Sequence, residues 1–169
     1  VKIQAKTPRK VIVLINITYL GRNFGVMLFK DTITKEKLLK YYVKNQTNAL
    51  YKQGIQELKD KGVKFTEEDL IWVFKNKDGK IIFLEKGKNS GGFQHILKHK
   101  EEFLDKGIFE EDLAEFIMES LKNGKIVGKE GSRFVYEYIY KGIKQTTAIT
   151  VSSNGFVVGA NPVSKFKKL

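Results

Sequence analysis

The 169-residue sequence contains no cysteine, only two prolines and two histidines, and one tryptophan. The absence of cysteine excludes disulfide bonds, thiol catalysis and thiolate ligands for a metal ion. Its longest apolar stretch, residues 11–20, is interrupted by Asn16 and Thr18 and falls short of the roughly 18 apolar residues that a membrane span requires. We therefore expect a soluble protein without a membrane span. Because the chain begins at Val1 without a signal-like region, we also expect it to be part of a longer protein.

Acidic residues are scarce relative to basic ones. The chain has 31 Lys and Arg against 19 Asp and Glu, a net charge of +12. The excess is uneven, because residues 1–62 carry +9 (13 basic, 4 acidic) and residues 63–169 carry +3 (18 basic, 15 acidic). A field of this sign attracts polyanions, of which nucleic acid is the most common and anionic membrane the next. A lysine-rich surface that only solvates the protein is the alternative interpretation.

The first 62 residues predict a small α+β unit. Apolar, β-branched segments over 11–20 and 24–29 predict two strands, joined by a turn at Gly21, Arg22 and Asn23. Apolar residues at helical intervals predict a long helix over 35–60 that Gly54 weakens in its middle. We assign this basic region a role in RNA binding, entry or another accessory function.

Residues 63–169 predict a second α+β domain. A capping box at Thr66 predicts one helical turn, and an Asp-Gly hairpin joins strands over 71–74 and 80–85. Two amphipathic helices, over 93–107 and 109–123, come next. From Lys125 the period of apolar residues changes to two, which predicts an antiparallel meander of four strands. Its strands are expected over 125–127, 133–140, 144–151 and 156–160.

The meander offers two faces with different properties. In its third strand Thr146, Ala148 and Thr150 alternate with more apolar residues, which predicts a polar face toward solvent. In its second strand the tyrosines share one parity, so they either form a stacking surface for bases or pack within the fold. These tyrosines are Tyr136, Tyr138 and Tyr140.

Both histidines, His95 and His99, lie four residues apart at the start of the first helix of this domain. That spacing places both imidazoles on one side of the helix. The glycine-rich loop 87–92 precedes them, with Asn89 and Ser90 as candidate helix caps and with backbone amides that could face an anion. A flexible cationic loop therefore leads into a helix that carries two titratable rings.

Three interpretations of the histidine pair are open. A zinc site would need a carboxylate such as Glu102, because the chain has no third histidine and Ile96 occupies the place of a metalloprotease's glutamate. The rings could instead be structural. The third interpretation is metal-free acid–base chemistry on a phosphodiester, in which lysines hold the phosphate. The composition and the loop favour the third.

The motifs around the histidines resemble those of toxin nucleases in the barnase, EndoU, colicin D and RelE superfamily. The resemblance covers residues 63–169 and joins a Gly-x-x-His-Ile-x-x-basic-His helix to a Ser-Asn-Gly hairpin. The segments that carry it are Glu85-Lys86-Gly87, Gly92-Phe93-Gln94-His95-Ile96, Lys98-His99, Phe103, Gly107-Ile108 and 153–162. Members with such motifs stand at the C-termini of bacterial polymorphic toxins, including contact-dependent inhibition proteins, and of phage-borne proteins.

The resemblance implies a fold of two helices packed on an antiparallel sheet, and metal-independent cleavage of RNA, often tRNA. In that reaction a 2′-hydroxyl attacks the adjacent phosphorus and leaves a 2′,3′-cyclic phosphate, with no cofactor. It also implies a cognate immunity protein, in some relatives elongation factor Tu as a partner, and delivery within a larger bacterial toxin that acts in the target-cell cytoplasm.

The resemblance assigns roles by position. His95 becomes the general base or acid, and Lys98 and His99 match the basic-His end of the motif; Lys98 stands where an arginine is usual, so it keeps the charge without the bidentate fork. The predicted catalytic residues are His95, His99, Thr150 and Ser152. The predicted phosphate-binding residues are Lys86, Lys88, Lys98, Arg133, Ser153 and Asn154. A basic nucleic-acid-binding module without catalysis, in which both histidines are structural, is the alternative.

Overall fold

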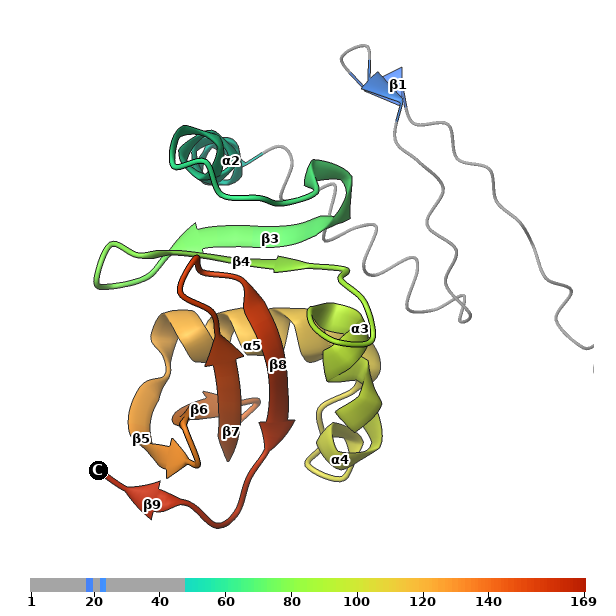
Figure 1. Cartoon of the computed structure of the whole chain (residues 1–169). Coiled ribbons are helices and arrows are strands. Elements are labelled where there is room, and N and C mark those ends of the chain that lie inside the picture. Colours follow the sequence, from blue (N-terminus) through green and yellow to red (C-terminus); the bar gives the residue numbers. More distant parts are fainter. Residues whose placement is uncertain (1–17, 20–21, 24–47) are drawn as a thin grey trace, which may run out of the picture. The chain divides into compact units, whose positions relative to one another are not determined.

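The computed structural model describes residues 18–19, 22–23 and 48–169 (Figure 1). Its contacts divide the chain into two compact units, Val1–Lys30 and Asp31–Leu169. In the first unit, β1 (Thr18–Tyr19) pairs antiparallel with β2 (Arg22–Asn23). Strand β2 therefore consists of Arg22 and Asn23, two residues that we predicted to lie in the turn. The rest of both strands predicted in this region, and the predicted helix before residue 48, lie outside the described residues.

Helix α2 (Ala49–Asp60) covers the hairpin of β3 (Leu70–Lys75) and β4 (Ile81–Glu85). The helix begins where the Asn48 side chain accepts a hydrogen bond from the Leu50 amide at 2.9 Å, an N-cap that satisfies one of the unpaired amides of the first turn. The end of the predicted long helix is thus confirmed within the described residues.

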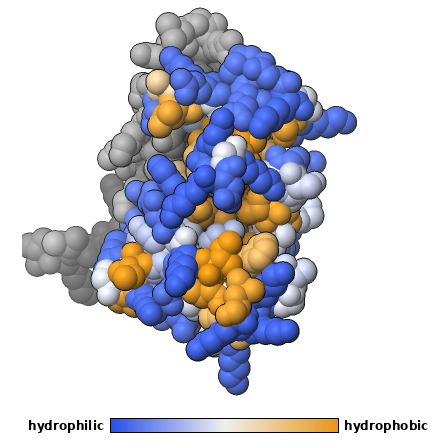
Figure 2. All heavy atoms as spheres, turned by 90° about the vertical axis from the view of Figure 1, so that its left-hand side faces the viewer, coloured by the Kyte–Doolittle hydropathy of each residue, from blue (hydrophilic) through white to orange (hydrophobic). Residues whose placement is uncertain are grey.

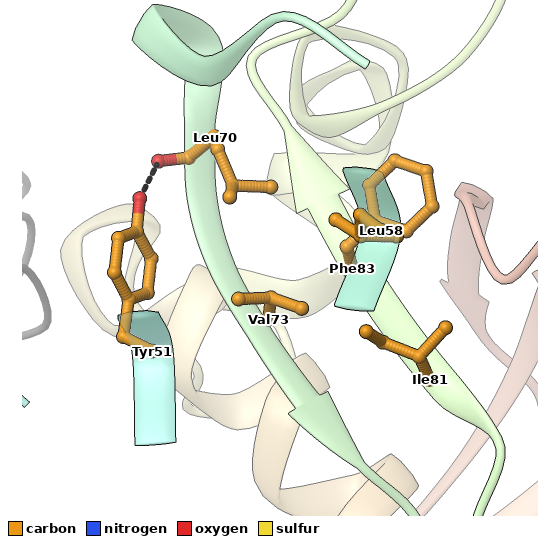
Figure 3. Close-up of a cluster of buried hydrophobic side chains, with 6 residues drawn as sticks. All are labelled: Tyr51, Leu58, Leu70, Val73, Ile81 and Phe83. Atoms are coloured by element: carbon orange, nitrogen blue, oxygen red, sulfur yellow. Dashed lines mark hydrogen bonds between the residues drawn. The ribbon is translucent and has the colours of Figure 1, made fainter. Parts of the chain in front are cut away.

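An apolar cluster joins α2 to the hairpin (Figure 3). Its buried members are Tyr51, Leu58, Leu70, Val73, Ile81 and Phe83. The Tyr51 hydroxyl donates to the Leu70 carbonyl oxygen at 3.1 Å, so the ring is buried with its polar atom paired. The cluster crosses residue 62, where the sequence analysis divided the chain, because α2 and the hairpin share one core.

The short helical turn and the hairpin form as predicted, but by different local bonds. The turn is a 3₁₀ helix, η1 (Glu67–Asp69), and the Thr66 side chain makes no capping bond. The predicted capping box is wrong because the turn ends after three residues and Thr66 instead donates its amide hydrogen to the carboxylate of Glu85. At the hairpin, the Asn76 side chain and the positive φ of Gly79 close the turn as expected.

The second sheet is antiparallel and has five strands, in the order β8-β7-β6-β5-β9. Its strands are β5 (Lys125–Glu130), β6 (Arg133–Tyr140), β7 (Ile143–Val151), β8 (Val157–Pro162) and β9 (Lys167–Lys168). The first four confirm the predicted meander, and the count of four strands is corrected to five. The sequence did not reveal β9 because two exposed lysines carry no alternation of apolar and polar residues. Gly128 of β5 admits this strand, since a Cβ there would lie 2.4 Å from the Lys167 carbonyl oxygen.

The segment between β8 and β9 covers one face of the sheet. Val163 and Phe166 pack there against Val135 and Ala148, and the Thr146 hydroxyl donates to the Val163 carbonyl oxygen at 2.5 Å. The face of β7 that carries Thr146, Ala148 and Thr150 was predicted to be polar and open to solvent. That prediction is wrong at Ala148, which is buried under Val163 and Phe166. A strand that looks half-polar in sequence is covered here by a segment that has no regular structure.

Helix α5 (Glu110–Asn123) covers the opposite face, behind the sheet in Figure 1. The Phe116 ring lies against Tyr138 and Tyr140, with centroids 6.4 and 5.2 Å apart. Burial raises the pKa of the Tyr136 hydroxyl on the same face. Of the two interpretations of the tyrosines, the structure supports packing within the fold.

The predicted helix over 93–107 consists of three short consecutive segments. They are α3 (Phe93–Ile96), η2 (Leu97–His99) and α4 (Lys100–Leu104), and α3 and α4 both lie beside β8. None of the helices that the structure describes is long and apolar enough to cross a membrane.

Two hydrogen bonds tie the hairpin of β3 and β4 to the rest of the unit. The Trp72 indole donates to the Ala114 carbonyl oxygen of α5 at 2.9 Å, and the Phe83 amide donates to the Gly155 carbonyl oxygen at 3.0 Å. The α+β fold expected for residues 63–169 thus forms, with α2 added to it.

Gly54 tests how closely α2 approaches the hairpin. A Cβ at this position would lie 2.8 Å from both γ-carbons of Val73. Alanine normally stabilises a helix relative to glycine by about 0.5–1 kcal/mol, but we expect Gly54→Ala to lower the unfolding free energy by about 1–3 kcal/mol through overpacking. Denaturant unfolding measures the change. Adding Val73→Ala should recover part of the loss, and a stabilising Gly54→Ala would contradict this close packing.

Candidate active site

The glycine-rich loop before α3 is a tight turn docked on the edge of the sheet. The Lys88 amide donates to the Gly91 carbonyl oxygen at 2.8 Å, the Gly91 amide donates back at 3.2 Å, and the Gly92 amide donates to the Val158 carbonyl oxygen of β8 at 3.0 Å. The amides of Lys88, Gly91 and Gly92 are therefore occupied, and the prediction that the loop amides are free for an anion is wrong for these three.

The helix start also differs from the prediction. The N-cap residue of α3 is Gly92, with φ of 85° and no side-chain capping bond. Asn89 and Ser90 do not cap this helix, because the chain turns back at Gly92 and passes close to Gly87. A Cβ at position 92 would lie 2.8 Å from the Gly87 Cα. Only a residue without Cβ fits this turn. The loop thus fixes the position of the Asn89 carbonyl oxygen beside the helix.

That carbonyl oxygen orients the first histidine. His95 Nδ1 and Lys98 Nζ each lie 2.8 Å from the Asn89 carbonyl oxygen. A carbonyl oxygen only accepts hydrogen bonds, so Nδ1 carries the hydrogen, and in the neutral ring Nε2 presents a lone pair. The half-buried ring therefore has a defined orientation and, when neutral, a defined tautomer.

The free side of His95 lies against β8. A Cβ at Gly159 would come 2.9 Å from Cδ2 and 3.3 Å from Nε2 of the ring. Gly159 pairs with Thr150 of β7, and directly paired residues place their side chains on the same face of a sheet, with Cα atoms about 4.5–5.5 Å apart. The register thus brings the Thr150 hydroxyl to the face on which His95 lies, as the prediction of a shared site requires.

His99 has a partner of another kind. Its Nδ1 lies 2.7 Å from Glu102 Oε1, one helical turn further along. The His95 and His99 rings are 6.3 Å apart, centroid to centroid, and nearly perpendicular at 86°. The chain therefore holds two imidazoles side by side, one fixed by a carbonyl group and the other by a carboxylate.

Arg133 lies at the start of β6 on the same face as Thr150. Its guanidinium donates one hydrogen bond to Asn161 Oδ1 and pairs with the carboxylate of Glu130. Asn161 belongs to β8, two residues after Gly159, so Arg133 reaches across the sheet toward the strand that supports His95. A phosphate at this face would compete with Glu130 for the guanidinium.

The remaining predicted residues fall into two groups. Ser152, Ser153 and Asn154 form the turn between β7 and β8, where the Ser152 hydroxyl donates to Asn154 Oδ1 and lies 3.1 Å from the Phe156 carbonyl oxygen. These bonds shape the turn and occupy the Ser152 hydroxyl. Lys86 and Lys88 belong to the loop that leads to α3, and Lys88 is exposed.

Sequence analysis missed several residues that build this site. Glu102 was considered only as a metal ligand, although its spacing from His99 already predicted contact on a helix. Gly159 and Asn161 were noted as part of a motif without a role, and the Asn89 carbonyl oxygen carried no signal because its role depends on the folded loop. Glu130 lies three residues before Arg133 and pairs with it across the turn between β5 and β6, so a local contact was overlooked. Among the described residues, no three His, Asp or Glu side chains are grouped to hold a metal ion.

The chain matches no protein-family model, and no curated protein matches it.

Gly159→Ala tests the contact between β8 and His95. The new Cβ would lie 2.9 Å from the ring, closer than Cβ atoms normally approach a neighbour, so we expect the imidazole to shift and the fold to survive at a cost of about 1–3 kcal/mol. Imidazole NMR signals report the shift, and the His99 ring serves as an internal control. His95 signals that match the wild type would show that the ring does not rest on Gly159.

Proposed function

We propose that this chain is a metal-independent ribonuclease toxin that cleaves RNA, above all tRNA, and leaves a 2′,3′-cyclic phosphate. The observation that carries the proposal is the placement of His95, whose Nδ1 is held by the Asn89 carbonyl oxygen while its Nε2 side lies against Gly159, the partner of Thr150. A general base needs a fixed tautomer, an available lone pair and neighbours that bind its substrate. The bond from Nδ1 to the Asn89 carbonyl oxygen supports the first of these for His95, and Lys98 and Thr150 are the proposed neighbours.

The proposed reaction needs one proton acceptor and one proton donor. An imidazole takes the proton of the 2′-hydroxyl, the 2′-oxygen attacks phosphorus, and the bond from phosphorus to the 5′-oxygen breaks. A second group gives a proton to that leaving oxygen, and the products are the cyclic phosphate and a free 5′-hydroxyl. His95 and His99, with ring centroids 6.3 Å apart, are close enough to serve one phosphodiester.

Cations around the rings would stabilise the charge that develops on the phosphate oxygens. Lys98 lies beside His95 through the shared Asn89 carbonyl oxygen, and Arg133 lies on the same sheet face as Thr150. Placed dipoles and charges of this kind commonly supply the largest part of catalysis in phosphoryl transfer. The net charge of +12 would draw RNA toward them.

The biological setting rests on the resemblance of residues 63–169 to toxin nucleases. On that basis we propose that the domain is delivered as part of a larger bacterial toxin and acts in the cytoplasm of a target cell. A cognate immunity protein would neutralise it, and elongation factor Tu is a candidate host partner. Ser153 and Asn154 would then contact RNA from the turn between β7 and β8.

A non-catalytic RNA-binding module is the competing function. The ion pair between Arg133 and Glu130 and the pair between His99 and Glu102 are compatible with a purely structural role for these residues. The two functions differ in one result, because only the ribonuclease produces cleaved RNA.

Replacing His95 tests the proposed catalysis. We expect wild-type protein to cut tRNA in the presence of EDTA and to leave a 2′,3′-cyclic phosphate, identified at the new 3′ end by mass spectrometry. His95→Ala should lower the rate by about 10²–10⁴-fold, the usual effect of a positioned acid–base group. Gln94→Ala, a neighbouring change in α3, is the control and should cut normally. Full activity of His95→Ala, or activity that EDTA abolishes and zinc restores, would contradict the mechanism.

The salt dependence of RNA binding tests the lysines beside the site. Each phosphate contact that is lost should reduce the slope of log affinity against log salt by roughly 0.7–0.9. We expect Lys86→Gln and Lys88→Gln each to reduce the slope by that amount in a filter-binding or fluorescence titration. Lys77→Gln, an exposed change at the far end of the hairpin of β3 and β4, should leave it unchanged. Equal slopes for all three variants would assign the lysines to general solvation.

A further inference from the structure

Charge is unevenly distributed within residues 63–169. Residues 63–124, which form the hairpin of β3 and β4 and the helices α3, α4 and α5, carry −3 (10 basic, 13 acidic). Residues 125–169, which form the five-stranded sheet, carry +6 (8 basic, 2 acidic). The two acidic residues of the sheet region, Glu130 and Glu137, are paired with Arg133 and Lys144. The excess positive charge of the sheet is therefore carried by its other lysines.

Two of these lysines lie directly opposite each other on adjacent strands. Lys129 of β5 pairs with Lys167 of β9, and both are exposed. Like charges at directly paired positions repel each other and oppose the pairing of the strands. In the part of the chain that the structure describes, neither lysine forms an ion pair with a carboxylate. An anion bound at this pair would remove the repulsion.

The neighbour of Lys129 on its other side is an exposed aromatic ring. Phe134 of β6 pairs with Lys129 and is 41% exposed, and Lys129 Nζ lies 4.8 Å from the centroid of the ring. Directly paired residues share one face of a sheet. Lys167, Lys129 and Phe134 therefore form a row of two cations and one aromatic ring across three strands, which we call the Phe134 surface.

Phe134 differs from the tyrosines that follow it on the same face of β6. Tyr138 and Tyr140 pack against the Phe116 ring of α5, whereas Phe134, at the start of the strand, makes no contact with another aromatic ring in the described part of the chain. Figure 2 views the molecule from the side on which Figure 1 shows β5, and a hydrophobic area lies there among hydrophilic residues. The ring of Phe134 is thus accessible to a flat partner.

We propose that the Phe134 surface binds single-stranded nucleic acid, with one base stacked on Phe134 and with phosphates held by Lys129 and Lys167. Single strands offer flat bases beside a charged backbone, and proteins bind them by combining aromatic rings with cations. A protein partner fits this surface less well, because the cores of protein interfaces are depleted in lysine. The inference involves neither histidine and does not depend on cleavage.

A second pair of an exposed phenylalanine and a lysine provides a matched control. Phe109 is 51% exposed, and Lys141 Nζ lies 6.0 Å from the centroid of its ring. Lys141 is held by the Asp112 carboxylate at 2.8 Å, and Glu110 and Glu111 follow Phe109 in the sequence. The same two groups are therefore present, but the negative charge beside them repels phosphate.

The test is a fluorescence-anisotropy titration of the whole chain with a labelled oligothymidylate at several salt concentrations. This single-stranded DNA lacks the 2′-hydroxyl, so binding is measured without the proposed cleavage. Variants of the surface are Phe134→Ala, Phe134→Leu, Phe134→Trp, Lys129→Gln and Lys167→Gln, and the controls are Phe109→Ala and Lys141→Gln. Thermal unfolding of each variant shows that the fold is retained.

We expect Phe134→Ala and Phe134→Leu to weaken binding about 5- to 150-fold, the effect of losing one stacked base, with no change in the slope of log affinity against log salt. Phe134→Trp should bind at least as tightly as wild type, since it keeps a ring. Lys129→Gln and Lys167→Gln should each reduce the slope by about 0.7, the value of one phosphate contact on a single strand. Both control variants should match wild type.

Four results would overturn the inference. Wild-type affinity of Phe134→Leu would show that no ring is needed, and an equal effect of Phe109→Ala and Phe134→Ala would show that the position of the ring does not matter. Equal slopes for Lys141→Gln and Lys129→Gln would assign the lysines to general attraction. Vesicles that contain phosphatidylserine are the further probe, because a Phe134→Ala variant that loses vesicle binding and keeps oligonucleotide binding would assign the surface to a membrane.

The outcome is separable from the proposed function. A wild-type protein that cuts no tRNA would contradict the ribonuclease and leave the oligothymidylate result unaffected. Loss of the Phe134 effect, with tRNA still cut, would contradict this inference alone.

Discussion

The docking of the loop before α3 on the edge of β8 is the contact on which the candidate site depends. The Gly92 amide is bonded to the Val158 carbonyl oxygen, and the resulting turn presents the Asn89 carbonyl oxygen to both His95 and Lys98. No side chain performs this function, so a backbone atom sets the tautomer of the central ring. The position of His95 thus depends on the backbone conformation of the loop more than on the side chains of the loop.

The sheet contributes through its register. Because Thr150 pairs with Gly159 and Ala148 with Asn161, the strands supply a hydroxyl, an open space for the imidazole and an acceptor for Arg133 on one face. A shift of one residue would turn all of them to the other side. Helix α5 covers one face of the sheet (Figure 1), and the Val163–Phe166 segment covers the other. Packing on both faces holds that register in place.

Sequence patterns predicted the elements well and their contacts less well. The Asp-Gly hairpin, α5 and the four-stranded meander followed from turn residues and apolar periods, and the spacing of the two histidines placed both rings on one side. Nothing local could show that Arg133 also bonds to Asn161, that Ala148 is covered by Val163, or that α2 shares a core with the hairpin. The predicted caps at Thr66 and Asn89 did not form: Glu85, distant in sequence, accepts the Thr66 amide hydrogen, and Gly92 takes the N-cap position of α3.

The fifth strand has a consequence for how the molecule meets its own copies. Open strand edges invite pairing between chains and are the usual starting point of β-aggregation. Here α3 and its loop lie along β8, and β9 pairs with β5 at the other side of the sheet. Strand β9 pairs with Gly128 and Lys129 of β5, and its own outer edge consists of Lys167 and Lys168, both exposed and charged. Figure 2 shows one face of the molecule, on which hydrophilic residues surround hydrophobic areas. Two copies that approach each other through β9 would bring four ammonium groups together, so charge opposes pairing at this part of the sheet edge as well as the shortness of β9.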